Sequence, residues 1–189
     1  MKRSEVNQAV KQASDFFNAN GWTLPPDPIW DVTDFGLGNF KQYGLILINL
    51  ASEAEYSEKL IYATRKQQTP AHCHRKKKED IACRLGILVL RLWPEIPYLT
   101  NQNLPFEVQI NNKMEFVFPG QEIILKAGER ITLIPGMYHE FYPDSKACIL
   151  SEVSTANDDL NDNFFANPKV GRFSEIEEDE PACFQLIND

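Results

Sequence analysis

Three histidines and one glutamate in this 189-residue chain have the spacing of a metal site. His72 and His74 are separated by one residue, Glu79 follows five residues later, and the third and last histidine is His139. Alternate side chains of a β-strand share a face, so His72 and His74 can project together, and Glu79 can return towards them after a short turn. Three imidazoles and one carboxylate suit Mn, Fe, Co, Ni or Zn and leave positions for substrate oxygens. We therefore predict one divalent metal ion inside a β-barrel.

The side chains between these candidate ligands are expected to have ordinary roles. Cys73 would point to the opposite face of the strand from both histidines, which favours a buried free thiol over a ligand. Lys76 and Lys78 are expected to lie in solvent. The four cysteines of the chain are scattered without a CxxC pair, so neither a zinc knuckle nor a disulfide framework is indicated.

The composition is that of one ordinary globular domain, with 43% hydrophobic and 24% charged residues. A net charge of −8 argues against nucleic acid or an anionic membrane as a partner, because both would require a basic face. No apolar run is long enough to span a membrane, and the N-terminus lacks the apolar core of a signal peptide. We expect a cytoplasmic protein.

The N-terminal region precedes the elements that must position the site. Apolar residues at helical spacing predict a helix, with Ser4 as its N-cap and Gly21 after its last turn. Residues 22–32 contain three prolines and are expected to form an extended arm that lies over the domain. We therefore divide the chain into a helix and arm, 1–33, and a barrel, 34–189.

Residues after the arm alternate between short strand-like segments and turns rich in Gly, Pro and Asn. Hairpins are expected at residues 111–113 and 126–129. The pattern predicts an all-β dominated fold, an antiparallel sandwich or barrel. The acidic run 175–180 is expected to be a solvated face or a disordered tail, whereas residues 164–176 are expected to be docked. The expected strand segments are 43–50, 59–65, 72–74, 81–93, 106–110, 114–118, 122–125, 131–134, 139–142 and 147–153.

The metal motif also carries a family resemblance. His72-x-His74-x4-Glu79-x6-Gly86 resembles the first motif of the cupin superfamily. A second group, which consists of Gly128, Gly136 and His139, resembles its second motif. Three further segments, 69–81, 152–163 and 171–181, resemble the D-lyxose ketol-isomerases. The resemblance implies a single cupin (jelly-roll) β-barrel and a homodimer. It also implies a Mn²⁺-dependent aldose–ketose isomerase that acts on D-lyxose and D-mannose.

The isomerase resemblance draws attention to three further residues. Lys77 is a candidate proton carrier, or a hydrogen-bond donor to a developing oxyanion, because the family pattern has a lysine there. Glu152 could project into the barrel as a catalytic group or lie at the surface of a strand end. Arg172 could bind the distal hydroxyls of a sugar, since a guanidinium offers a fork of donors, or it could pair with the acidic run 175–180.

Two other classes of function fit the same ligands. One is another metallocupin enzyme, either a phosphosugar isomerase, for which Arg65, Lys66 and Arg75 could supply positive charge, or a dioxygenase. The other is a non-catalytic sugar-binding cupin. The ligand pattern alone does not separate these alternatives from an isomerase whose substrate is a small-molecule sugar.

Overall fold

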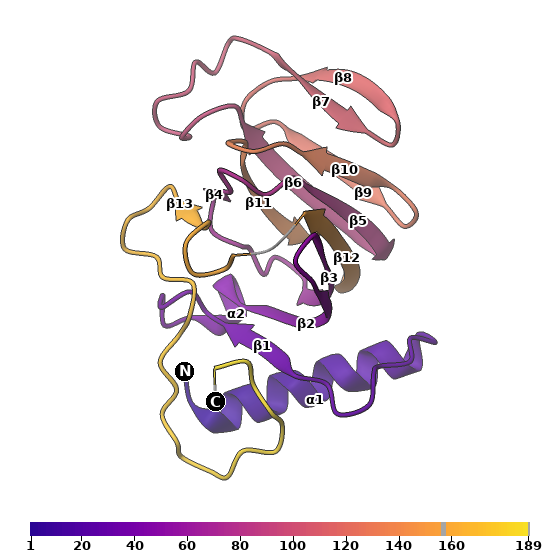
Figure 1. Cartoon of the computed structure of the whole chain (residues 1–189), viewed down its shortest axis with the longest axis vertical. Coiled ribbons are helices and arrows are strands. Elements are labelled where there is room, and N and C mark those ends of the chain that lie inside the picture. The colour runs from indigo at the N-terminus through magenta and orange to yellow at the C-terminus, as the bar shows by residue number, and fades with distance from the viewer. Residues whose placement is uncertain (156–157, 189) are drawn as a thin grey trace.

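The computed structural model of the protein describes residues 1–155 and 158–188, and it consists mainly of two antiparallel sheets (Figure 1). The eight-stranded sheet has the order β1-β2-β3-β12-β5-β10-β7-β8, and the five-stranded sheet has the order β13-β4-β11-β6-β9. The predicted all-β fold with an N-terminal helix is confirmed. The helices are α1 (Arg3–Ala19) and α2 (Phe40–Tyr43), and the strands are β1 (Trp30–Thr33), β2 (Leu45–Ser52), β3 (Tyr56–Thr64), β4 (His72–Cys73), β5 (Glu79–Leu85), β6 (Ile87–Trp93), β7 (Phe106–Ile110), β8 (Lys113–Val117), β9 (Glu122–Lys126), β10 (Arg130–Leu133), β11 (Tyr138–Pro143), β12 (Ala147–Thr155) and β13 (Phe164–Phe165).

Strand β2 shows how the core is divided into two parts. Its alternate residues Leu45 and Leu47 face the core between the two sheets, which also receives side chains from β6 and β11. Ile46 and Ile48 face a second core beneath α1. Both faces of the strand are therefore buried, which explains its nearly continuous apolar sequence.

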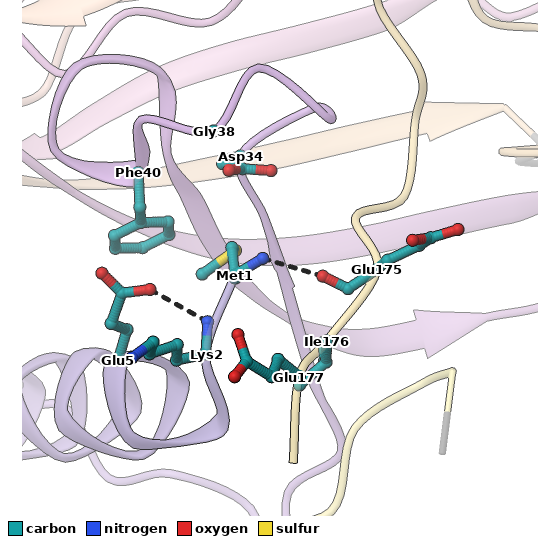
Figure 2. A pocket seen from close by; sticks show the side chains of 9 residues that line it. All are labelled: Met1, Lys2, Glu5, Asp34, Gly38, Phe40, Glu175, Ile176 and Glu177. Carbon is teal, nitrogen blue, oxygen red and sulfur yellow. Dashed lines mark hydrogen bonds between the residues drawn. The ribbon is translucent and has the colours of Figure 1, made fainter. Parts of the chain in front are cut away.

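The acidic run 175–180 is docked at the start of α1, but its five acidic residues stay exposed, so the expected solvated face is confirmed and the alternative of a disordered tail is wrong. The amino group of Met1 donates to the backbone oxygen of Glu175 at 2.8 Å (Figure 2). Arg3 pairs with Glu178 at 2.6 Å, and the Ser4 hydroxyl donates to Asp179 at 2.7 Å. These carboxylates lie at the N-terminus of α1, where backbone N–H groups and the helix dipole favour negative charge.

The ends of α1 test the predicted capping residues. Ser4 is not the N-cap, because the helix begins one residue earlier and its N-cap is Lys2. The carboxylate of Glu5 accepts the Lys2 backbone N–H at 2.9 Å (Figure 2). Gly21 does follow the C-cap Asn20, with a φ of 79° that glycine adopts readily.

The chain changes sheets at two glycine-containing turns. Segment 81–93 is interrupted at Gly86, with β5 in one sheet and β6 in the other. The hairpin predicted at residues 126–129 is wrong, because β9 pairs with β6 whereas β10 pairs with β5 and β7. The hairpin at residues 111–113 is confirmed by the pairing of β7 with β8.

The arm and the tail both add strands to the sheets. Trp30 is buried and pairs with Ile48 of β2, although the neighbouring Ile29 is 45% exposed. The division at residue 33 stays a prediction. In the tail, the predicted docking of segment 164–176 is confirmed at β13, which pairs with β4. Two residues of the 152–163 segment, Ala156 and Asn157, lie outside the described residues.

Candidate active site

Three histidines meet between the two sheets. His72 in β4 is the register partner of His139 in β11, and their ring centroids are 4.2 Å apart. His74 follows β4 and is buried. One ligand nitrogen from each imidazole lies within 4.8 Å of the other two. Antiparallel pairing of short strands that are far apart in sequence therefore brings the predicted histidines together.

Backbone carbonyls orient all three imidazoles. The Nδ1 atoms lie 2.8 Å from the Pro70 oxygen for His72, 2.6 Å from the Asp162 oxygen for His74, and 3.2 Å from the Met137 oxygen for His139. A carbonyl can only accept, so each Nδ1 carries the proton and each Nε2 keeps a free lone pair. This is the arrangement of metal-ligating histidines.

The charge state of two imidazoles also suits a metal. Burial lowers the pKa of His72 well below its usual value, and the neighbouring His139 and His74 lower it further. Burial likewise lowers the pKa of His74. Both rings are therefore neutral near pH 7, which is the form that can donate a lone pair to a cation.

Glu79 is buried beside two of the histidines. Its Oε1 lies 3.1 Å from His139 Nε2, and its Oε2 lies 3.7 Å from His74 Nε2. Burial by itself would raise the pKa of Glu79, but the Lys77 ammonium outweighs it and the pKa lies well below the usual value. Among the described residues, neither carboxylate oxygen accepts a hydrogen bond of good geometry. A buried carboxylate with unused acceptor positions, beside the Nε2 lone pairs of His74 and His139, fits a divalent cation.

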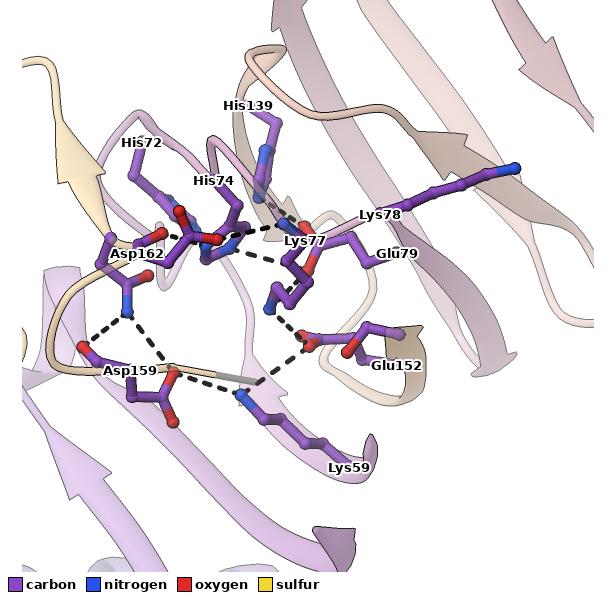
Figure 3. A network of polar contacts seen from close by, with 12 residues as sticks. Lys59, His72, His74, Lys77, Lys78, Glu79, His139, Glu152, Asp159 and Asp162 are labelled. Carbon is purple, nitrogen blue, oxygen red and sulfur yellow. Dashed lines mark hydrogen bonds and ion pairs between the residues drawn. The ribbon is translucent and has the colours of Figure 1, made fainter. Parts of the chain in front are cut away.

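Lys77 lies between two carboxylates (Figure 3). Its Nζ atom is 2.7 Å from Glu79 Oε2 and 2.9 Å from Glu152 Oε1, and its side chain is only 2% exposed. Burial by itself would lower the pKa of Lys77, but Glu152 and Glu79 outweigh it and raise the pKa. The group is therefore an ammonium that can donate hydrogen bonds. Glu152 is also buried, so it is not the surface carboxylate that one interpretation of the sequence expected.

Arg172 lines the same pocket but pairs with the N-terminal arm. Its guanidinium binds the buried carboxylate of Asp31 in β1 and lies 3.8 Å from Asp159. The alternative partner of Arg172, the acidic run 175–180, pairs instead with Arg3.

The remaining basic and thiol side chains near the histidines follow the expectations. Lys76 and Lys78 are exposed, and Figure 3 shows the Lys78 side chain pointing away from the histidines. Cys73 is a buried free thiol.

Three functional side chains escaped sequence reasoning. Lys59 is 3% exposed and lies 3.7 Å from Glu152 and 3.4 Å from Asp159. Asp31 is the partner of Arg172, and Asp162 contacts the segment that carries Lys77. A charged residue beside the apolar run 60–63 was the signal for Lys59. Asp162 lies inside the 152–163 segment that resembles the family, but the resemblance assigned it no role. Asp31 left no signal, because its partner Arg172 is more than 80 residues away.

Comparisons with known proteins agree with this geometry. The family model described as D-lyxose isomerase matches residues 29–189. The chain is 32% identical to the D-lyxose/D-mannose isomerase of Escherichia coli O157:H7, across 100% of this chain and 98% of the relative. It is 29% identical to the D-lyxose ketol-isomerase of Cohnella laeviribosi, across 95% of this chain and 100% of the relative.

Solved structures confirm the predicted cupin-type barrel. The L-ribose isomerase of Cellulomonas parahominis, solved with L-ribose, has a TM-score of 0.69 at 16% identity and covers 94% of this chain and 98% of its own. That of Geodermatophilus obscurus has a TM-score of 0.70, also at 16% identity and with the same coverage. These likenesses show the fold. The family model spans well over half of the chain, and the Escherichia coli relative aligns along its full length, so this chain belongs to the D-lyxose isomerase family.

Proposed function

We propose that the protein is a metal-dependent aldose–ketose isomerase that interconverts D-lyxose and D-xylulose, and also D-mannose and D-fructose. One observation carries the proposal: three imidazoles converge, two of them lie beside Glu79, and Lys77 joins Glu79 to a second buried carboxylate, Glu152. A cation site and a proton-transfer pair are thus adjacent, in a chain whose relatives are named as isomerases of these sugars.

The metal is held by His72, His74, Glu79 and His139, and Mn²⁺ is the proposed ion. Nitrogen and carboxylate donors together suit Mn²⁺ and its neighbours in the first transition row. When bound, the cation supplies Lewis-acid stabilisation of the negative charge that develops on substrate oxygens.

Glu152 and Lys77 divide the proton chemistry. Isomerisation of an aldose moves a proton from C2 to C1 and a hydroxyl proton from O2 to O1. The Glu152 carboxylate is the base that takes the C2 proton and delivers it to C1. Lys77 is an ammonium between two carboxylates, so it donates a hydrogen bond to the substrate oxygen that gains negative charge.

Arg172 binds the distal hydroxyls of the sugar. It lines the pocket, and its pairing with Asp31 fixes the direction of the guanidinium. A planar group with five donors, held by one buried carboxylate, can still present its remaining N–H groups to a sugar.

The charge of the pocket favours an uncharged sugar over a phosphosugar. Lys59, Lys77 and Arg172 each lie next to carboxylates. The side chains that could have formed a phosphate cluster are also engaged: Lys66 lies 3.1 Å from Asp144, and Arg75 stacks on the Phe164 ring. A phosphate would therefore compete with carboxylates for Lys59, Lys66, Lys77 and Arg172.

The test uses protein stripped of metal and refilled with Mn²⁺. We expect conversion of D-lyxose and D-mannose to their ketoses, equally with and without oxygen, and little conversion of phosphorylated aldoses. H139A should lose both metal and activity. Metal-loaded protein that converts no free pentose or hexose would refute the isomerase function, and strict oxygen dependence would favour a dioxygenase.

We also propose a homodimer formed through strand β8, which ends the eight-stranded sheet. Three alternate apolar side chains along this edge, Met114, Phe116 and Phe118, are between 50% and 70% exposed. An antiparallel edge strand with an apolar face can pair with its own copy about a twofold axis. F116E should therefore yield a monomer in sedimentation velocity, whereas a wild-type monomer at micromolar concentration would refute the dimer.

No helix among residues 1–155 and 158–188 is long and apolar enough to cross a membrane. A cytoplasmic location stays a prediction.

A further inference from the structure

Asp162 is a buried carboxylate that holds the turn between two of the proposed metal ligands. Its side chain is in the C-terminal segment and the residue is 3% exposed. Its carboxylate accepts the backbone N–H of Arg75 at 2.9 Å, of Lys76 at 3.2 Å and of Lys77 at 3.0 Å. Three successive N–H groups therefore converge on one anion, which is a nest of the kind that binds anionic groups.

The main chain of the same residue contacts the metal site from the other side. The backbone oxygen of Asp162 lies 2.6 Å from His74 Nδ1 and accepts a hydrogen bond from it. Asp162 thus contacts the His74 imidazole, which precedes the turn, and the backbone N–H of Lys77 within the turn. Figure 3 shows Asp162 lying beside His74 and facing the start of the turn.

The turn would be hard to hold without this carboxylate. It contains four consecutive cationic residues, 75–78, which repel one another. Its amide groups at positions 75–77 point to Asp162, so removal of the acceptor leaves partly buried donors unpaired. Lys77 could then no longer be kept between Glu79 and Glu152.

We propose that Asp162 is a positioning residue that fixes the His74 imidazole and the Lys77 ammonium relative to Glu79. It acts through these groups and does not itself touch the substrate. The effect on turnover rests on the proposed isomerase function, whereas the effect on metal binding does not. Carboxylate and carbonyl partners of metal-ligating histidines typically contribute about 10–100-fold to metal affinity or activity.

The variant D162N tests the role of the carboxylate alone. Asparagine keeps the shape and the backbone carbonyl, but its NH₂ group cannot accept from the amides of the turn. D158N is the matched control, because Asp158 lies in the same segment and its carboxylate, among the described residues, bonds only to Asn161. Both variants lose one negative charge. A difference in metal affinity or turnover between them therefore reports on the contacts of the Asp162 carboxylate and not on net charge.

Titration of the metal-free proteins with Co²⁺ gives a readout that is independent of turnover. We expect D162N to bind Co²⁺ at least about tenfold more weakly than D158N, with changed visible absorption bands. With saturating Mn²⁺, kcat for D-lyxose should fall by about 10–100-fold while KM stays within about twofold. Equal Co²⁺ affinity, spectrum and kcat in the two variants would overturn the proposal.

A measurement on the wild-type protein covers the case in which D162N does not fold. The amides of residues 75–77 should exchange their hydrogens slowly, since a buried carboxylate binds all three. Exchange at the rate of a free loop would overturn the proposal. If the wild type converts no aldose, the isomerase function fails, but the Co²⁺ titration and the exchange experiment still decide the role of Asp162.

Discussion

Replacement of Lys77 by methionine should separate catalysis, metal binding and stability in one variant. Methionine fills a similar apolar volume but removes the ammonium that lies 2.7 Å from Glu79 and 2.9 Å from Glu152. Both carboxylates then remain in an environment where Glu79 is 2% exposed and Glu152 11% exposed.

The expected changes have different signs. Loss of one partner from a buried ion pair costs about 3–5 kcal/mol, so the metal-free variant should be less stable by about this amount. For a chain of this length that corresponds to a Tm about 6–20 °C lower. Metal affinity should be unchanged or higher, because a cation that competes for Glu79 has been removed. Turnover should fall by about 10²–10³-fold, the usual cost of removing one hydrogen-bond donor to an oxygen that gains negative charge.

The assay compares K77M with K78M, since Lys78 is the exposed neighbour and its replacement removes the same charge. Thermal unfolding with and without Mn²⁺, Mn²⁺ titration and initial rates on D-lyxose are measured for both variants. The reasoning fails if K77M keeps turnover within a few-fold of K78M. It also fails if K77M loses its metal, because Lys77 would then support the ligands and not the chemistry.

Three further predictions use other parts of the structure. Removal of metal by a chelator should lower the Tm by about 5–11 °C relative to protein with Mn²⁺ at one hundred times its Kd. Binding at that concentration stabilises the folded state by about 2.7 kcal/mol. An unchanged Tm would argue against the metal site. D31N should destabilise the protein by about 3–5 kcal/mol in urea unfolding because Arg172 loses its buried partner, and a change below about 1 kcal/mol would show that the pair contributes little. G86A should cost more stability than G128A. Both glycines have φ above 90°, which costs alanine about 1–2 kcal/mol of strain, but only at Gly86 would an added Cβ lie 2.6 Å from the backbone oxygen of Ala147. Equal losses of stability in the two variants would contradict this close contact at Gly86.

Local sequence patterns predicted the elements of the fold well. Alternation and turn residues identified the strands, because the two-residue period of a strand is fixed by its own backbone. They misassigned the turn at residues 126–129, where two strands that are adjacent in sequence belong to different sheets. A turn residue signals that the chain reverses, but the sheet that receives the next strand depends on which apolar faces can be buried together.

The sequence by itself determined the proposed ligand set, since His72 and His74 share a strand spacing and Glu79 follows at a motif distance. The family pattern singled out Lys77 from Lys76 and Lys78, but only the tertiary structure showed that Lys77 alone of the three is buried. The burial of Lys77 depends on carboxylates from β5 and β12 and on the Asp162 carboxylate 85 residues away. The physical reason is that a charge can be buried only where its partners converge, and that convergence is set by the packing of distant strands and not by neighbours in the chain.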